Sequence, residues 1–143
     1  MIQEMARFGD GYVVEGLYTG RDISAVIIRC PGDMSYETNG LLSKAIECAY
    51  NGKNHAVLDM AKVERVDTHA IGIIAAGCFE AEKQGLELLL ANVCSNVDRL
   101  FGFIGLRDTL ATYGSIDRET IREEPNERRR AVLEAVKEGF GVQ

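Results

Sequence analysis

The sequence predicts an α/β fold with a mixed β-sheet, in the order ββαβαβα followed by a C-terminal helix. Two observations predict it. The β-rich segments at residues 11–18 and 23–30 are joined by the turn-like sequence TGRD, which is typical of an antiparallel hairpin. Further along, segments with strand and helix periodicity alternate, and such strand–helix–strand units form parallel strands with right-handed crossovers.

The later elements follow from apolar spacing and from glycines. The first helix is expected within residues 35–54, where Gly52 ends a helical pattern formed by Leu41 or Leu42, Ala45, Ile46 and Ala49. A short strand at 55–60, a helix ending at Gly85 and the apolar strand LELLLANV at 86–93 come next. Residues 95–105 then form a helix with Ser95 or Asn96 as its cap. Strands 55–60 and 87–92 should therefore be parallel neighbours.

The C-terminal segment differs in character from the rest. From about Asp117, acidic and basic residues are interleaved, and Pro125 marks the expected start of the last helix. Val132, Val136 and Phe140 fall on one stripe of that helix, with Leu133 beside it. The stripe either packs back on the domain or meets a dimer or partner helix. The sequence thus divides into a domain at 1–118 and a helical extension at 119–143.

Composition restricts the classes of partner. A chain of 143 residues fits one domain, and its 46% apolar and 27% charged content is that of an ordinary globular protein. A net charge of −6 without a long Lys/Arg block argues against direct nucleic-acid binding and favours a protein partner. The four cysteines form no Cys-x-x-Cys pair, so no metal or cofactor is expected. Because no signal peptide or apolar run of about 20 residues is found, we expect a cytoplasmic protein without a membrane span.

The junction Asp67-Thr68 lies between a strand and a nearly all-apolar helix. An Asp or Thr at this place is a normal N-cap, because its side-chain oxygen satisfies an amide of the first helical turn. The alternative is a nucleophilic hydroxyl, which needs a base within hydrogen-bond reach. Only His55 and His69 are available, and no nucleophile-elbow signature accompanies them.

The two sides of this helix are expected to differ. A turn of about 100° per residue places Ile71, Ile74, Ala75, Cys78 and Glu82 on the core side. The other side then carries His69, Ile73, Ala76, Gly77, Glu80 and Gln84. A single exposed Ile73 is ordinary for a soluble protein, but beside Thr68 it is also consistent with a small contact surface.

Residues 10 to 118 resemble the STAS domain of bacterial anti-anti-sigma factors. The resemblance rests on the Asp-hydroxyl pair at 67–68, Gly72, the turn Gly85, the strand LLLANV, the Ser-capped helix VDRLF and the segment GLRDTL. It implies helices packed mainly on one face of a mixed sheet, and a non-enzymatic protein that regulates transcription. The family's usual Asp-Ser-Ser-Gly pattern is replaced here by Asp67, Thr68, His69 and Ala70.

The resemblance also implies a phosphorylation switch. In that family the hydroxyl residue after the Asp is phosphorylated by a kinase that doubles as the anti-sigma factor, and here that residue is Thr68. A phosphatase would be a further partner, and a homodimer through the C-terminal helix is a further expectation. The alternative is a stressosome-type or other structural STAS subunit that acts as an assembly scaffold. The expected partner-binding residues are Asp33, Ser35, Asp67, His69, Ile73, Ala76 and Gly77.

Overall fold

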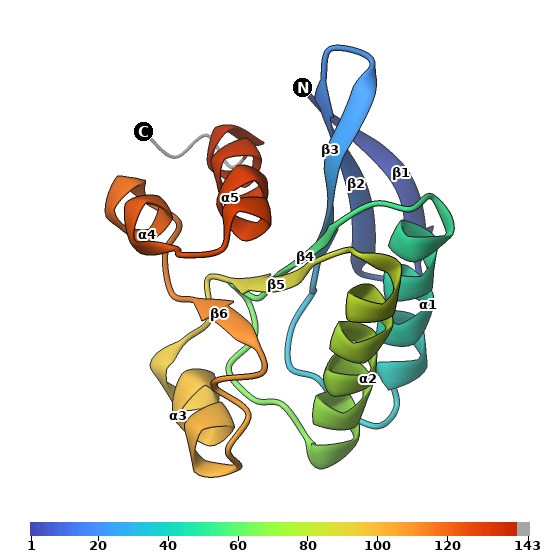
Figure 1. Ribbon diagram of the computed structural model, residues 1–143. Helices are drawn as coiled ribbons and strands as arrows, with labels where there is room; N and C mark the ends of the chain where they lie inside the picture. The colour runs from blue at the N-terminus through green and yellow to red at the C-terminus, as the bar shows by residue number, and fades with distance from the viewer. Residues whose placement is uncertain (140–143) are drawn as a thin grey trace.

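One mixed sheet of six strands organises the molecule, and the strands lie in chain order from β1 to β6 (Figure 1). They span Ile2–Phe8 (β1), Tyr12–Thr19 (β2), Asp22–Arg29 (β3), Ala56–Asp59 (β4), Leu88–Ala91 (β5) and Ala111–Tyr113 (β6). The first three strands are antiparallel, and β3 to β6 are parallel. The structure is a computed structural model that describes residues 1–139.

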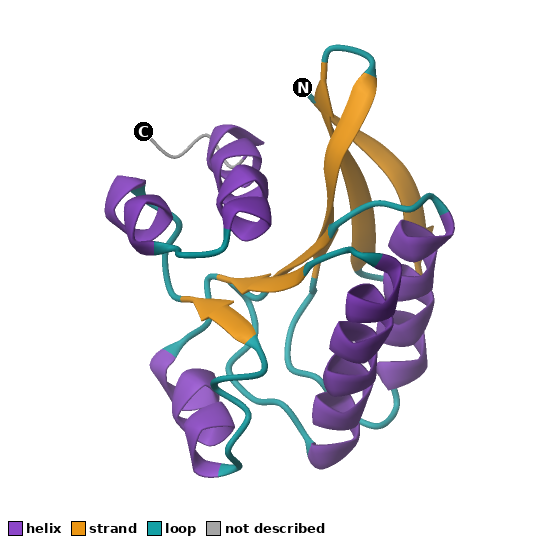
Figure 2. Ribbon diagram, viewed as in Figure 1, coloured by secondary structure: helices purple, strands orange, loops and turns teal. Residues whose placement is uncertain are grey.

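The helices cover both faces of this sheet (Figure 2). They span Asn39–Asn51 (α1), Thr68–Gln84 (α2), Ser95–Phe103 (α3), Arg118–Glu123 (α4) and Glu127–Gly139 (α5). Helices α1, α2 and α3 share one core with the sheet, and α4 and α5 form a second core on the opposite face. The predicted α/β class is confirmed, and so is the prediction that β4 and β5 are parallel neighbours joined by a helix that starts at Thr68.

Three elements are absent from the predicted order. The edge strand β1 was missed because most of its side chains are exposed, so its sequence shows no clear apolar alternation. Strand β6 has 3 residues and helix α4 has 6, and such short elements carry little periodic signal. The expected hairpin and the central strands and helices lie within a few residues of their predicted bounds.

The central strands explain the two-layered core. Every residue of β4 and of β5 is buried, because helices pack on both faces of these strands. Ile28, Leu58 and Leu90 point into the core with α1, α2 and α3. Val57 and Leu89 point into the core with α5. Both faces of β5 therefore need apolar side chains, which explains the continuous apolar sequence of this strand.

Helix α5 packs back on its own domain. Its residues Val132, Leu133 and Val136 are buried against the second face of the sheet, which confirms the intramolecular alternative for the stripe. These three side chains are therefore occupied within the chain, and a homodimer through another part of this helix stays a prediction. Phe140, which was placed on the same stripe, lies outside the described residues.

A buried carboxylate fixes the start of α5. Glu87, directly before β5, is 6% exposed and accepts hydrogen bonds from Arg128 (Nη2 to Oε2, 3.0 Å) and Arg129 (Nε to Oε1, 2.5 Å). Arg128 also donates to the carbonyl oxygen of Gly85 at 2.9 Å. Two arginines thus neutralise a carboxylate that would be costly to bury alone.

Across residues 1–139, no helix combines the length and the apolar character needed to cross a membrane.

We predict that Leu133→Ala destabilises the protein by about 2 to 5 kcal/mol, because it removes a fully buried side chain and leaves a cavity. The exposed neighbour Glu134→Ala should stay within about 0.5 kcal/mol of wild type. Chemical denaturation at several protein concentrations measures both. A loss in Leu133→Ala that depends on protein concentration would contradict intramolecular packing, since it would indicate a contact between two chains.

Candidate functional site

Helix α2 begins with a capped first turn. Asp67 has an extended backbone, and its Oδ1 accepts the amide hydrogen of Ala70 at an N–O distance of 2.8 Å. Asp67 is therefore the N-cap, and Thr68 is the first residue of the helix. Of the two residues that could have been the cap, the structure selects the aspartate and leaves the threonine side chain exposed.

Asn39 links the starts of α1 and α2. Its Nδ2 donates to Asp67 Oδ1 at 3.0 Å and lies 2.9 Å from Nδ1 of His69. Because the amide nitrogen is a donor, Nδ1 of His69 is the acceptor in this contact. Asn39 is fully buried, and its Oδ1 has no hydrogen-bond partner among residues 1–139. A buried side chain of α1 therefore orients two residues that flank Thr68.

These contacts keep Asp67 ionised. The hydrogen bond from the Ala70 amide lowers the pKa of Asp67 below its ordinary value of 3.8, and the bond from Asn39 and the nearby His69 act in the same direction. Hydrogen bonds that are donated to a carboxylate favour its charged form. Thr68 consequently follows a fixed negative charge.

The segment after β3 is tied to the segment before α2. Asp33 Oδ1 accepts hydrogen bonds from the amides of Glu64 and Arg65, at 2.9 and 3.0 Å. Met34 forms an isolated parallel bridge with Val66, and its carbonyl accepts the amide hydrogen of Asp67 at 3.2 Å. Asp33 therefore has a structural role in joining two loops, and its own side chain remains exposed.

An exposed aromatic side chain stands beside this junction. Tyr36 is 76% exposed, and its ring centroid lies 5.2 Å from that of His69, with the planes tilted by 45°. Thr68 and Ser35 are also exposed. The expected residues Ser35, Asp67 and His69 are thus brought together, and Tyr36 joins them. The sequence reasoning missed Tyr36, although an aromatic residue in the polar segment DMSYET is a signal for it.

The buried side of α2 differs from the predicted one. Its buried residues are Ala70, Ile74, Gly77 and Ala81, so the core-facing line is rotated by roughly one residue from the predicted one. Ile74 faces the core as predicted. The surface position predicted for Gly77 is wrong, because its carbonyl accepts a hydrogen bond of 2.7 Å from the Tyr50 hydroxyl and a Cβ there would lie 3.0 Å from Leu88.

Two further residues of the predicted contact surface differ in exposure. Ile73 is half-buried and packs against the core instead of standing free in water. Ala76 is exposed as expected. On the outer line of α2, Phe79 is 64% exposed, which the predicted rotation did not show. The surface beside Thr68 is therefore centred on the helix start and the 35–36 segment.

The nucleophile alternative finds no support in the geometry. Among residues 1–139, no hydrogen bond joins the Thr68 hydroxyl to a histidine. His69 uses Nδ1 toward Asn39, and His55 accepts the amide hydrogen of Glu87 at 3.0 Å. Burial, followed by the nearby Arg128, lowers the pKa of His55. The described residues also contain no group of three or more His, Cys, Asp or Glu that could hold a metal ion.

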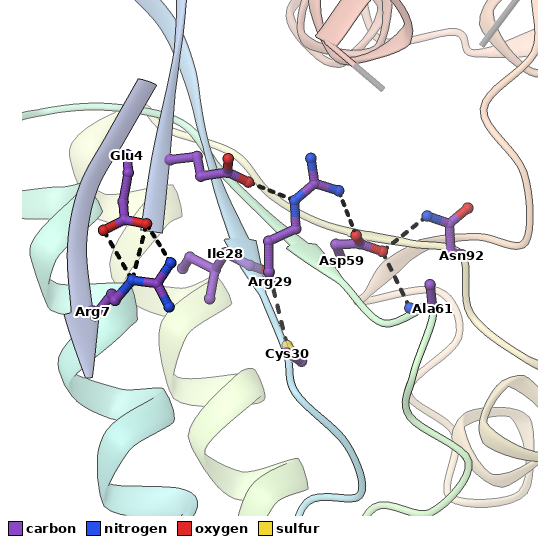
Figure 3. Close-up of polar contacts among 9 residues, drawn as sticks. Glu4, Arg7, Ile28, Arg29, Cys30, Asp59, Ala61 and Asn92 are labelled. Carbon is purple, nitrogen blue, oxygen red and sulfur yellow. Dashed lines mark hydrogen bonds and ion pairs between the residues drawn. The ribbon is translucent and has the colours of Figure 1, made fainter. Parts of the chain in front are cut away.

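A second polar cluster lies near the carboxyl ends of β3 and β4 (Figure 3). Arg29 donates to Glu15 at 2.6 Å and to Asp59 at 2.7 Å. Asp59 also accepts from Asn92 at 2.9 Å and from the amide of Ala61 at 3.2 Å. This cluster joins β2, β3, β4 and the loop after β5, so we assign it a structural role.

A family model of the STAS domain matches residues 18–119. The chain belongs to the STAS domain family. The match runs from the end of β2 to the start of α4, so the STAS match contains the whole Thr68 junction. Strand β1 and helix α5 lie outside it.

Solved structures show the same fold. A candidate anti-sigma factor antagonist from Thermotoga maritima is 22% identical, with a TM-score of 0.60 over 69% of this chain and 86% of that one. The anti-sigma factor antagonist SpoIIAA, in its unphosphorylated form, is 17% identical, with a TM-score of 0.54 over 93% of this chain and 99% of that one. A sulfate transporter family protein from Wolinella succinogenes is 16% identical, with a TM-score of 0.58 over 77% of this chain and 83% of that one. Comparison with curated protein sequences gives no significant match.

We predict that the wild-type protein loses more stability than Asp67→Asn as the pH falls below about 5. The pKa of Asp67 is lowered in the folded state, so its contribution is present above the unfolded-state pKa and is lost as the pH falls through the folded-state pKa. Asn keeps the cap but carries no charge that titrates. Chemical denaturation of both proteins between neutral pH and about pH 2 measures the difference. Parallel stability curves over this range would contradict the assignment.

Proposed function

We propose that this STAS domain is a non-enzymatic protein-binding module whose contact with an anti-sigma factor is switched by phosphorylation of Thr68. The observation that carries the proposal is the exposed Thr68 hydroxyl in the first turn of α2, directly after its cap and beside the exposed Tyr36. The likeness to anti-sigma factor antagonists supports the class of partner.

The fold can accept a phosphate at this place. Thr68 is exposed, and its side chain makes no hydrogen bond within residues 1–139 that the modification would break. A phosphothreonine carries a charge of about −1.5 to −2, which the positive end of a helix stabilises. Helix α2 is 17 residues long and presents that end at Thr68. Phosphorylation should therefore leave the domain folded.

A docked partner would be affected differently. A partner that covers Thr68, His69 and Tyr36 must remove water from this surface. A phosphate beside the ionised Asp67 raises the cost of that desolvation and repels acidic groups on the partner. The unphosphorylated protein then binds the anti-sigma factor and frees a sigma factor, whereas the phosphorylated protein is released. The kinase that modifies Thr68 is the same anti-sigma factor in this proposal, and the site of action is the cytoplasm.

We predict that Thr68→Glu weakens partner binding without unfolding the domain, since a glutamate places a negative charge at the same exposed position. The matched control is Thr19→Glu, which makes the same change in the β2–β3 hairpin at the opposite end of the molecule (Figure 1). Each protein is immobilised and used to capture partners from a lysate of its own organism, with identification by mass spectrometry.

The expected result is an anti-sigma factor or serine/threonine kinase that is captured by wild type and Thr19→Glu and lost with Thr68→Glu. The captured kinase, given ATP, should phosphorylate wild type at position 68 and should not label Thr68→Ala. Equal capture by all three proteins, or equal labelling of Thr68→Ala, contradicts the proposal.

We also predict that Tyr36→Ala reduces the affinity for the captured partner by about 2 kcal/mol or more, because exposed aromatic side chains at the centre of an interface contribute most of its binding energy. The control is Phe79→Ala, which removes an exposed aromatic residue that lies about 16 Å from Thr68 along α2. Calorimetric titration and thermal melting of both variants separate binding from folding. A larger loss of affinity in Phe79→Ala would move the contact surface away from the helix start.

A further inference from the structure

Two residues at the amino ends of the central strands join the sheet to the last helix. His55 directly precedes β4 and Glu87 directly precedes β5, so they are neighbours in this parallel pair. The backbone amide of Glu87 donates a hydrogen bond of 3.0 Å to Nδ1 of His55. The side chain of Glu87 binds Arg128 and Arg129 at the start of α5. Glu87 therefore couples a histidine ring to the position of a helix that lies outside the STAS match.

The protonation state of His55 decides whether the hydrogen bond from Glu87 exists. A backbone N–H only donates, so Nδ1 of His55 is the acceptor and carries no proton in this contact. The doubly protonated ring has an N–H on each nitrogen and accepts at neither. Protonation thus leaves the partly buried amide of Glu87 without its acceptor, and an unpaired buried donor is unfavourable.

The groups around His55 favour its neutral form. They come from the β2–β3 hairpin, from the residue before β5 and from α5, and they are Thr19, Ser24, Glu87, Arg128, Glu134 and Glu138. Burial lowers the pKa of His55 below its ordinary value of 6.5, the charge of Arg128 acts in the same direction, and the charge of Glu87 opposes them. Glu134 and Glu138 are exposed, so water screens their effect on the ring. The folded protein therefore holds His55 in the form that accepts from Glu87.

The sign of the pH dependence follows from this preference. Because the pKa of His55 is lowered in the folded state, its contribution is present above the unfolded-state pKa of about 6.5 and is lost as the pH falls through the folded-state pKa. Each unit between the two pKa values changes an opening equilibrium about tenfold. Val132, Leu133 and Val136 are buried further along α5, so one proton should loosen the first turn of the helix and leave the rest in place.

We infer that His55, Glu87 and Arg128 form a pH-sensitive latch, in which protonation of His55 releases the first turn of α5 from the start of β5. The release widens two cavities that Arg128 lines, with volumes of about 350 and 400 Å³. The latch does not depend on phosphorylation of Thr68, because Thr68 starts a helix that packs on the opposite face of the sheet.

Hydrogen exchange of the full chain, measured by NMR, tests the latch. The reporters are the amides of Glu87 and Arg130, which donate to His55 Nδ1 and to the carbonyl oxygen of Asn126. Their protection factors, corrected for the intrinsic effect of pH on exchange, should fall at least about tenfold between about pH 7.5 and about pH 5. Protection in α2, on the opposite face, should fall less. Unchanged protection of Glu87 over this range overturns the inference.

Two histidine variants provide the matched comparison. His55→Asn keeps an acceptor oxygen and carries no group that is protonated, so the protection of Glu87 and Arg130 should be the same at both pH values. His69→Asn makes the same change at the other histidine of the chain and should show the wild-type fall. An equal fall in His55→Asn, or its loss in His69→Asn, contradicts the role of His55.

Titration of the histidine rings by NMR gives a second readout, which does not require opening of the helix. His55 should titrate with a midpoint below about 6.5, and Arg128→Gln should raise this midpoint. Arg122→Gln, an equal change of charge at an exposed position of α4, should leave it unchanged. A wild-type midpoint above about 6.5, or one that Arg128→Gln does not move, overturns the inference. Thermal melting verifies that each variant is folded.

Discussion

The hydrogen bond from the buried Asn39 amide to the Asp67 carboxylate is the contact on which the geometry of the candidate site depends. Asn39 starts α1 and Asp67 caps α2, so the bond fixes the two helix starts relative to each other. The same amide also orients His69, against which Tyr36 lies. Thr68 and Tyr36 come from segments more than 30 residues apart, and this buried amide makes them parts of one surface.

The sheet separates the molecule into two layers, each with its own core. The face that carries α1 and α2 also carries the Thr68 junction. At this junction, Asp33 and Met34 join the loop after β3 to the loop before α2. The other face is covered by α5, which Glu87 anchors through two arginines. Because β4 and β5 are buried on both faces, the extension is part of the core and is not an appendage.

The sequence predicted the fold better than it predicted the surface. Continuous apolar strands and glycine helix stops identify the central elements, because these signals reflect burial that both faces of the sheet require. A helix cap at Asp67 could also be predicted from the sequence, since capping involves only neighbouring residues of the chain. The edge strand β1 could not be predicted, because most of its side chains are exposed and its sequence does not alternate between apolar and polar residues.

The predicted rotation of α2 about its axis was wrong because tertiary contacts determine which side of this helix is buried. Its core-facing line contains Ala70, Gly77 and Ala81, which are small and give a weak hydrophobic signal. At Gly77 the close approach of α1 and β5 requires a small residue, because an added Cβ would lie 3.0 Å from Leu88 and 3.5 Å from Ile46. Asn39 and Tyr36 were missed for a related reason. The importance of Asn39 arises from residues that the fold brings near it, and no local pattern marks it. Tyr36 has a local signal, an aromatic residue in a polar segment, but its position beside His69 depends on the fold.

The most direct measurement of the central claim is hydrogen exchange in Asn39→Ala, compared with wild type by NMR. If the buried amide holds the two helix starts together, its loss should speed exchange at Ala70 and Asp67, whose amides bond to the Asp67 side chain and to Met34. Exchange in β5 should be unchanged, apart from any effect of lower global stability. Unchanged protection at Ala70 and Asp67, in a variant that remains folded, would contradict the account.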